Sequence, residues 1–256
     1  MSGAGGEYAV RGEYHRRLDR SWRYYPIYKE KQRLIRRWLR SVPRNWKILD
    51  AGCGEGLLVE EFRSQGYGIE GLDLHFESDY VRRGDLLRTG VPDGTYDAVL
   101  ALDVIEHLPF ADQERAFDEI LRILRPGGLL VATIPNLAHF SSRLAFLFTG
   151  RFLRTSTIDR HPGDRPLGEY RALLKKRFKL QSVRGIFPTF PISSLLTLLF
   201  PAAMLPWHRV LNAVAAVPGW CFLNLFICEK PARALRAAKP AADVPVIARP
   251  GQRKAA

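Results

Sequence analysis

Residues 47–56 read K-I-L-D-A-G-C-G-E-G, and this stretch decides the fold. A short apolar run ends at Asp50, a helical pattern occupies residues 57–65, and between them glycines recur at alternate positions: Gly52, Gly54 and Gly56. Glycine has no Cβ, so it adopts positive φ and lets a ligand approach the backbone closely. The stretch therefore predicts a strand, a tight turn and a helix, with a ligand lying across the turn. A turn that only packs the strand on the helix is the alternative.

The spacing and charge of this turn indicate what kind of ligand it suits. G-x-G-x-x-G seats a pyrophosphate on a helix N-terminus, whereas this chain has G-x-G-x-G with an acidic residue two places before the first glycine. An acidic turn favours a cationic ligand without phosphate. Asp73, which ends a predicted strand at residues 68–74, lies 21 residues after Gly52. A carboxylate at that strand end can accept hydrogen bonds from both ribose hydroxyls.

The rest of the chain alternates between strand and helix patterns. An amphipathic helix at residues 111–124 is followed by R-P-G-G, which cannot continue a helix. The further strands are predicted at residues 80–87, 95–102, 129–135, 178–187 and 221–230. This alternation favours an α/β fold with a doubly wound parallel sheet.

Six short motifs follow one another along the chain, and their order and spacing are informative: D-A-G-C-G-E-G, G-L-D-L, R-G-D-L, D-V-I-E-H-L, L-R-P-G-G and I-P-N. Together they resemble the class I S-adenosylmethionine-dependent methyltransferases, most of all the branch with quinone O-methyltransferases and methyltransferases of saccharide and lipid-linked pathways. The resemblance covers residues 47–136 motif by motif and the general layout to about residue 230. It implies a mostly parallel seven-stranded sheet with an antiparallel edge hairpin, here with an apolar helical insertion before the last strand.

The same resemblance implies the cofactor, S-adenosylmethionine, and its binding residues. The glycine turn would lie along the methionine and ribose portions, and Asp73 and Leu74 would contact the ribose. Asp85 would bind the adenine amino group and Leu86 would lie beside the adenine ring. The backbone of Leu102 would contact the methionyl part. The predicted set is Asp50, Gly52, Cys53, Gly54, Gly56, Asp73, Leu74, Asp85, Leu86 and Leu102.

Methyl transfer from a sulfonium is an in-line displacement, so positioning of the nucleophile supplies most of the rate enhancement. An oxygen or nitrogen nucleophile can also need a base. His107 is the first candidate and His139, just past the fifth strand, is the second, because the ordinary histidine pKa of about 6.5 suits that role. A purely structural role for His107 is the alternative.

Asp103, Glu106 and His107 stand at i, i+3 and i+4, which on a helical turn share one face. Quinone O-methyltransferases have a comparable acidic-x-x-Glu-His group that is proposed to hold a divalent ion. Many relatives carry the same run without metal, so no metal ligand is predicted and Mg²⁺ stays an open alternative.

The formal net charge of +13 is concentrated at the two ends of the chain. Residues 1–47 hold 13 Lys/Arg against 4 Asp/Glu, residues 48–228 hold 19 against 20, and residues 229–256 hold 7 against 2. Basic ends suit an anionic membrane surface or a phosphorylated substrate, with nucleic acid as the other candidate. A merely solvated basic surface is the plain alternative.

The scattered cysteines favour neither a disulfide framework nor a zinc site, and no signal-peptide pattern opens the chain, so we expect a cytoplasmic protein. Its predicted acceptor is a hydroxyl on a small or lipid-attached molecule, either a quinone precursor or a saccharide. Nucleic-acid methylation is the second hypothesis, although the N/D-P-P-Y/F run of base-methylating enzymes is absent. A non-catalytic binding module is the third, and the intact glycines and Asp73 count against it. The oligomeric state is not predicted.

The predicted domain organisation has three parts. Residues 1–45 form a basic, helical region that covers the cofactor site, residues 46–230 form the methyltransferase domain, and residues 231–256 form a disordered basic tail. Residues 137–177 are predicted to be a lid insertion.

Residues 188–220 are apolar but interrupted by prolines, and neither half has the roughly 20 uninterrupted apolar residues of a spanning helix, so a transmembrane pair is the less favoured alternative. Two short helices are predicted instead, packed over the substrate mouth or dipping into a membrane. The second option would give peripheral attachment to the inner face of the membrane.

Overall fold

The structure is a computed structural model that describes residues 18–154 and 156–232. The first part of the predicted N-terminal region and nearly all of the predicted tail lie outside these residues. One mixed sheet of seven strands organises the described chain, in the order β3-β2-β1-β4-β5-β7-β6. The strands are β1 (Lys47–Ala51), β2 (Gly68–Asp73), β3 (Val81–Arg83), β4 (Tyr96–Leu102), β5 (Leu124–Pro135), β6 (Lys179–Pro188) and β7 (Cys221–Glu229).

The pairing along the sheet matches the predicted topology. The neighbours from β3 to β5 are parallel, whereas β7 pairs antiparallel with both β5 and β6. The doubly wound sheet with an antiparallel edge hairpin is therefore confirmed. Its helices are α2 (Tyr25–Ser41), α3 (Leu57–Arg63), the 3-10 turn η1 (Ile105–His107), α4 (Phe110–Ile123), α5 (Phe140–Thr149), α6 (Leu167–Lys175), α7 (Pro191–Leu199) and α8 (Leu205–Val214).

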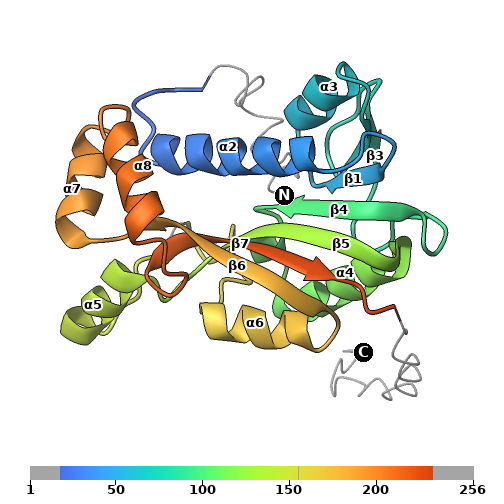
Figure 1. Cartoon of the computed structure of the whole chain (residues 1–256). Coiled ribbons are helices and arrows are strands. Elements are labelled where there is room, and N and C mark those ends of the chain that lie inside the picture. Colours follow the sequence, from blue (N-terminus) through green and yellow to red (C-terminus); the bar gives the residue numbers. More distant parts are fainter. Residues whose placement is uncertain (1–17, 155, 233–256) are drawn as a thin grey trace, which may run out of the picture.

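Two apolar cores lie on opposite faces of the sheet, because successive strand residues point to opposite sides. In β1, Ile48 packs with the core beneath α2 and α3, while its neighbour Leu49 packs with the core beneath α4 and α6. Figure 1 shows α2 and α3 above the sheet and α4 and α6 below it. A strand covered on both faces is largely apolar, as residues 129–135 of β5 are, with Thr133 as the one polar side chain.

The structure differs from the sequence prediction in the extent of two strands. The third strand is only Val81–Arg83, and the fifth begins at Leu124, so R-P-G-G lies within β5. The pairing of β4 with β5 is irregular there, between Tyr96 and Ala98, because Pro126 has no N–H to donate. Pro126 therefore marks an irregular strand start, and the helix before it ends at Ile123.

The predicted lid insertion at residues 137–177 is not one unit. Its last part, α6, buries Leu167, Tyr170 and Leu174 in the core beneath the sheet. Its helical spacing of apolar residues explains this packing. Helix α5 and the described residues of the loop at 150–154 and 156–166 are not part of that core.

The apolar insertion at residues 188–220 forms two short helices, α7 and α8, as predicted. Helix α8 packs on α2 and β6. Within the described residues, no helix combines the length and the apolar character that a membrane crossing requires.

Candidate active site

The glycine turn between β1 and α3 has the backbone that its sequence predicts. Gly52, Gly54 and Gly56 have φ values of +76°, +55° and +69°, a region that favours glycine. A Cβ on Gly52 would lie 2.5 Å from Val104 Cγ2, so this turn packs tightly against the segment after β4. The Gly52 N–H donates to Leu72 O at 2.7 Å, which ties the turn to the end of β2.

Asp73 ends β2 and fixes the same turn. Its Oδ2 accepts the Gly54 N–H at 2.8 Å, and its Oδ1 accepts the N–H groups of His75 and Phe76 at 2.9 and 3.1 Å. These three hydrogen bonds tie the carboxylate to the backbone of two segments. Asp73 therefore positions the glycine turn, a role that the sequence analysis did not predict.

A cavity of about 460 Å³ lies between this turn and α2, and we call it the central cavity. Asp50, Gly52, Cys53 and Leu102 of the predicted cofactor set line it. Its opposite wall comes from α2 and the residues before it, including the aromatic side chains of Trp22, Tyr24 and Tyr28. The helix that the sequence predicts before the first strand thus covers the glycine turn.

Two buried carboxylates line the central cavity without satisfying their oxygens. Among the described residues, Asp50 Oδ1 and both carboxylate oxygens of Glu55 have no hydrogen-bond partner. Burial raises the pKa of Asp50 to about 7, with nearby Lys31 opposing the rise and Asp73 adding to it. Buried acceptors without partners are costly, so these oxygens mark where a cationic or hydrogen-bond-donating ligand fits.

Lys31 of α2 crosses the cavity and pairs with Asp103, with 2.6 Å between Nζ and Oδ2. Burial lowers the pKa of Lys31, but the attraction of Asp103 outweighs burial and raises it overall. Asp103 has a φ of +58°, and Thr133 donates a hydrogen bond to its Oδ1. A non-glycine residue at positive φ directly after β4 is strained, which is common beside functional sites.

His107 stands at the end of η1 and faces the central cavity. Its Nδ1 lies 2.9 Å from the carbonyl oxygen of Arg160, which can only accept, so Nδ1 carries the proton and Nε2 keeps a lone pair. The packed atoms around the ring lower the pKa of His107, and His161 lowers it further. No described residue is hydrogen-bonded to His107 Nε2, so a neutral imidazole at this cavity wall can take a proton from a ligand.

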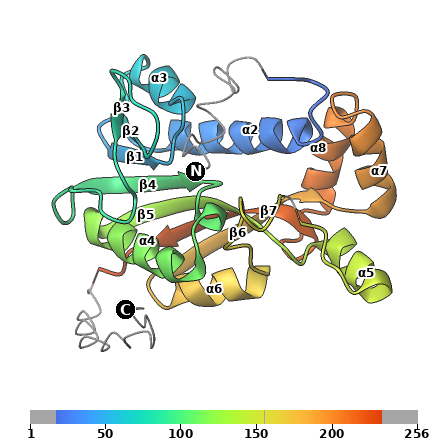
Figure 2. The same ribbon diagram turned by 180° about the vertical axis from the view of Figure 1, so that it is seen from behind.

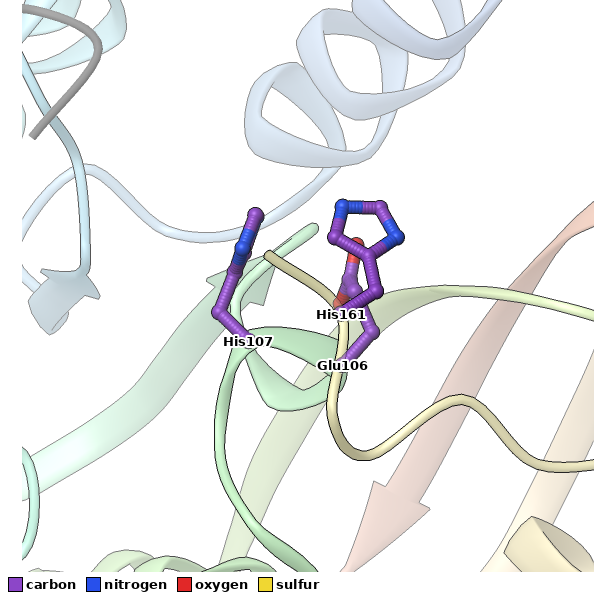
Figure 3. Close-up of side chains that lie close together, drawn as sticks. All are labelled: Glu106, His107 and His161. Carbon is purple, nitrogen blue, oxygen red and sulfur yellow. The ribbon is translucent and has the colours of Figure 1, made fainter. Parts of the chain in front are cut away.

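Two side chains from two segments of the chain, Glu106 and His161, lie beside His107. The rings of His107 and His161 meet edge to face, 4.6 Å between centroids, and Glu106 lies buried beside them. Figure 3 shows Glu106 and His107 rising from one turn and His161 from a separate loop, with both rings pointing to the same side. Burial, and then the charge of Asp103, raise the pKa of Glu106.

Ligand atoms of Glu106, His107 and His161 lie within 4.8 Å of one another. Asp103 is not part of this group, because Lys31 and Thr133 hold its carboxylate. Two imidazoles and one carboxylate suit a transition metal better than Mg²⁺, which prefers oxygen ligands. The residues present therefore do not fit the Mg²⁺ alternative raised by the D-V-I-E-H run.

Several predicted residues do not line the central cavity. Leu86 packs in the core, Leu74 is exposed, and exposed Asp85 accepts a hydrogen bond from the Leu87 N–H at 2.8 Å. Gly54, Gly56 and Asp73 lie next to the cavity, in or against the turn, without forming its wall.

His139 is a helix cap in this structure. It is buried, its Nδ1 accepts the Ser142 N–H at 3.2 Å at the start of α5, and it does not line the central cavity. Burial lowers the pKa of His139 to about 4. This geometry favours His107 over His139 as the base.

The residues that line the central cavity and that the sequence analysis missed include Lys31, Glu55, Arg160 and His161. Glu55 stands inside the glycine motif, so its position was a usable signal. His161 and Arg160 belong to a polar run beside the strand ends, but nothing local distinguishes them from its other members. Lys31 looks like one more basic residue of a basic helix.

Comparisons with known proteins agree with this geometry. A protein-family model described as a methyltransferase domain matches residues 14–198. A probable S-adenosylmethionine-dependent methyltransferase of Mycolicibacterium smegmatis is 36% identical over 104 residues, which are 37% of this chain and 40% of that protein. A ubiquinone biosynthesis O-methyltransferase of Colwellia psychrerythraea is 28% identical over 134 residues, 46% of this chain and 54% of that protein. The chain thus matches about half the length, or less, of these relatives.

Solved structures share the fold at low identity. A methyltransferase from Archaeoglobus fulgidus, described as dependent on S-adenosylmethionine, superposes with a TM-score of 0.55 at 16% identity. The alignment covers 88% of this chain and all of that one. At this identity the likeness shows the fold alone.

Proposed function

The chain belongs to the S-adenosylmethionine-dependent methyltransferases, and we propose that it transfers the cofactor's methyl group to a hydroxyl oxygen of a small or lipid-attached acceptor. One observation carries the proposal. A single cavity holds the glycine turn with its unpartnered carboxylates and also His107 with a free Nε2. Cofactor and acceptor can therefore meet inside it.

The residues of the turn fit the cofactor by charge. S-adenosylmethionine supplies a methyl group on a positively charged sulfur and also carries an ammonium group. Asp50 and Glu55 offer buried carboxylate oxygens without partners, which suit such a cation. Gly52 lines the central cavity with backbone atoms, and its missing Cβ leaves room for Val104 against the turn.

His107 accounts for the proton that an acceptor hydroxyl must lose. The hydroxyl proton passes to Nε2, while the oxygen takes the methyl group and the carbon–sulfur bond breaks to leave a neutral thioether. A lowered pKa keeps His107 neutral and ready to accept a proton near neutral pH. The Arg160 carbonyl stabilises the resulting imidazolium through Nδ1.

The aromatic wall of the central cavity supports a flat or cyclic acceptor. Tyr24 stacks on Phe222 with 5.6 Å between ring centroids, and Trp22 meets Tyr24 edge to face. Such rings give a large contact area for a quinone precursor or for the apolar face of a saccharide. Choosing between these two acceptors needs the metabolite experiment below.

Calorimetry with S-adenosylmethionine and S-adenosylhomocysteine tests the cofactor. We expect both to bind the folded protein. Absence of heat with both ligands, from protein shown to be folded by circular dichroism, overturns the proposed function.

Replacement of two histidines tests the base. His107→Gln should lower kcat by about 10²- to 10⁴-fold and remove the acidic limb of the pH profile, with little effect on cofactor affinity. His139→Gln serves as the comparison. If His139→Gln causes the larger loss of kcat while the fold is intact, the base is His139 instead.

The acceptor can be found by comparing metabolites of a deletion strain with its parent. We expect a methylated quinone precursor or saccharide to disappear. Loss of methyl groups from RNA or DNA alone would favour the nucleic-acid hypothesis. Cofactor binding without any missing methylated product would favour the binding module.

A further inference from the structure

Helices α5, α7 and α8 turn large apolar side chains toward solvent, and we call this surface the apolar face. Exposed side-chain fractions are high in all three helices: Leu147 73%, Phe148 81%, Ile192 77%, Leu199 59%, Trp207 47% and Val214 77%. Monomeric proteins rarely expose many such residues side by side. We therefore expect another molecule or a membrane to cover the apolar face.

The polarity of α7 and α8 is inverted relative to a helix that faces water. Ser193 and Thr197 of α7 are buried, as are His208 and Asn212 of α8. Thr197 Oγ1 lies 2.6 Å from His208 Nε2, and Asn212 Oδ1 accepts the Phe187 N–H at 2.7 Å. A helix on a water-exposed surface normally puts its polar side outward. Here hydrogen bonds occupy the inner side, and the large apolar residues, apart from the buried Leu211, are mostly exposed.

Aromatic contacts join the apolar face into one surface. Phe140 at the start of α5, Phe190 before α7 and Trp220 before β7 form a ring cluster with centroid distances of 5.6 to 6.4 Å. Figures 1 and 2 place α5, α7 and α8 at one end of the molecule, the end to which the arrowhead of β4 points. Ligands of such sheets bind at that end.

The charge of the apolar face indicates what covers it. Residues 137–158 and 186–220 contain no Asp or Glu and include four arginines: Arg143, Arg151, Arg154 and Arg209. All four are exposed. Arg154 pairs with Asp164 at 3.5 Å, and the other three have no acidic partner among the described residues. Outward apolar side chains beside unopposed arginines match the interface of an anionic bilayer.

We infer that the apolar face seats this protein on an anionic lipid surface. Attachment itself does not depend on the proposed methyl transfer. If methyl transfer holds as well, the geometry explains how a lipid-attached acceptor enters. Trp220 belongs to the apolar face, and Phe222, two residues later, lines the central cavity.

Vesicle co-sedimentation of the full chain tests the inference. The vesicles are phosphatidylcholine alone and phosphatidylcholine mixed with phosphatidylglycerol. We expect sedimentation with the mixed vesicles that high salt weakens without abolishing, because insertion of apolar side chains persists when charges are screened. Ile192→Glu with Leu199→Glu should reduce sedimentation at least tenfold. Both side chains are exposed, so the fold should tolerate the change.

Matched variants separate the two contributions. Phe110→Glu adds a carboxylate at a half-exposed aromatic outside the apolar face and should leave sedimentation unchanged. Arg151→Gln with Arg209→Gln should weaken binding to the mixed vesicles by roughly fivefold per arginine, which corresponds to about 1 kcal/mol each.

The competing occupants give different results. A wild-type protein that stays in the supernatant with both vesicle types overturns the inference. A second copy as the occupant would give a dimer in analytical ultracentrifugation that Ile192→Glu with Leu199→Glu converts to monomer, without vesicle binding. Cofactor binding measured on the same samples stays intact in every case where only the membrane contact fails.

Discussion

At the scale of a single residue, Asp73 has one structural role and one proposed binding role. Its carboxylate accepts three backbone N–H groups, including that of Gly54, and it stands at the strand end where a ribose would be read. Removing it loses a charge-assisted acceptor and leaves the turn without its restraint. Asp85, predicted beside it as an adenine contact, holds only its own loop in the ligand-free protein.

We therefore expect Asp73→Ala to weaken binding of S-adenosylhomocysteine by roughly 1.5–3 kcal/mol, the scale of a lost hydrogen bond to a charged group. Isothermal titration calorimetry measures it. Asp85→Ala is the comparison, and its effect should be smaller if Asp85 contributes only a single adenine contact. Equal affinities of Asp73→Ala and the wild type would contradict the assigned role of Asp73.

Asp50 makes stability depend on pH. Burial raises its pKa in the folded protein from 3.8 to about 7, so between these values the folded state holds a proton that the unfolded state has lost. The stabilisation is complete below about pH 4 and is lost as pH rises to about 7. Urea unfolding across this range should show this fall in the ligand-free protein. Asp50→Asn should lack this fall in stability with rising pH. An unchanged pH dependence in Asp50→Asn would show that Asp50 is not its source.

At the scale of elements, the joint between β1 and α3 depends on glycine for two separate reasons. Gly52 has positive φ and also has no room for a Cβ beside Val104. Gly66, in the turn after α3, has a φ of +82° and open space around it. The two positions therefore separate backbone strain from steric overlap.

Gly66→Ala should lower the free energy of unfolding by about 1 kcal/mol, the cost of positive φ alone. Gly52→Ala should lower it by about 2–4 kcal/mol, because overpacking adds to the same backbone cost. In a double-mutant cycle, Val104→Ala should restore part of the unfolding free energy that Gly52→Ala loses. Additive effects in the cycle would show that Val104 is not the obstacle.

At the scale of the whole molecule, the two proposals assign different ligands to two separate parts of the protein. Helix α2 closes the central cavity, held to the sheet by the pair of Lys31 and Asp103, whereas α5, α7 and α8 form the apolar face. Binding in the cavity should therefore stiffen α2 and the glycine turn, and binding of a bilayer should shield the apolar face.

Hydrogen–deuterium exchange distinguishes the two surfaces. S-adenosylhomocysteine should slow exchange in α2 and residues 50–57 and leave α7 unchanged, since ligand binding lowers the population of locally opened states. Phosphatidylglycerol-containing vesicles should slow exchange in α5 and α7 instead. The same protection pattern with both ligands would mean that one conformational change links the two surfaces.

The sequence alone determined the alternation of strands and helices and the glycine turn, because these depend on local signals, whereas the antiparallel edge hairpin was implied by the resemblance to the class I methyltransferases. Glycines at alternate positions predict a turn with positive φ, and Gly52 has that φ. The short apolar runs, separated by residues that break regular structure, predict the strands. A local signal also predicted the two short helices in residues 188–220, because prolines interrupt the apolar run.

Only the tertiary structure decided which distant groups meet. His161 joins His107 from 54 positions along the chain, and Lys31 removes Asp103 from the predicted Asp-Glu-His group across 72 positions. Packing likewise decided that α6 belongs to the core and that α7 turns Ser193 and Thr197 inward. Periodicity along a chain reports which residues share a face, whereas the partner of that face depends on how the elements pack, and no local pattern records it.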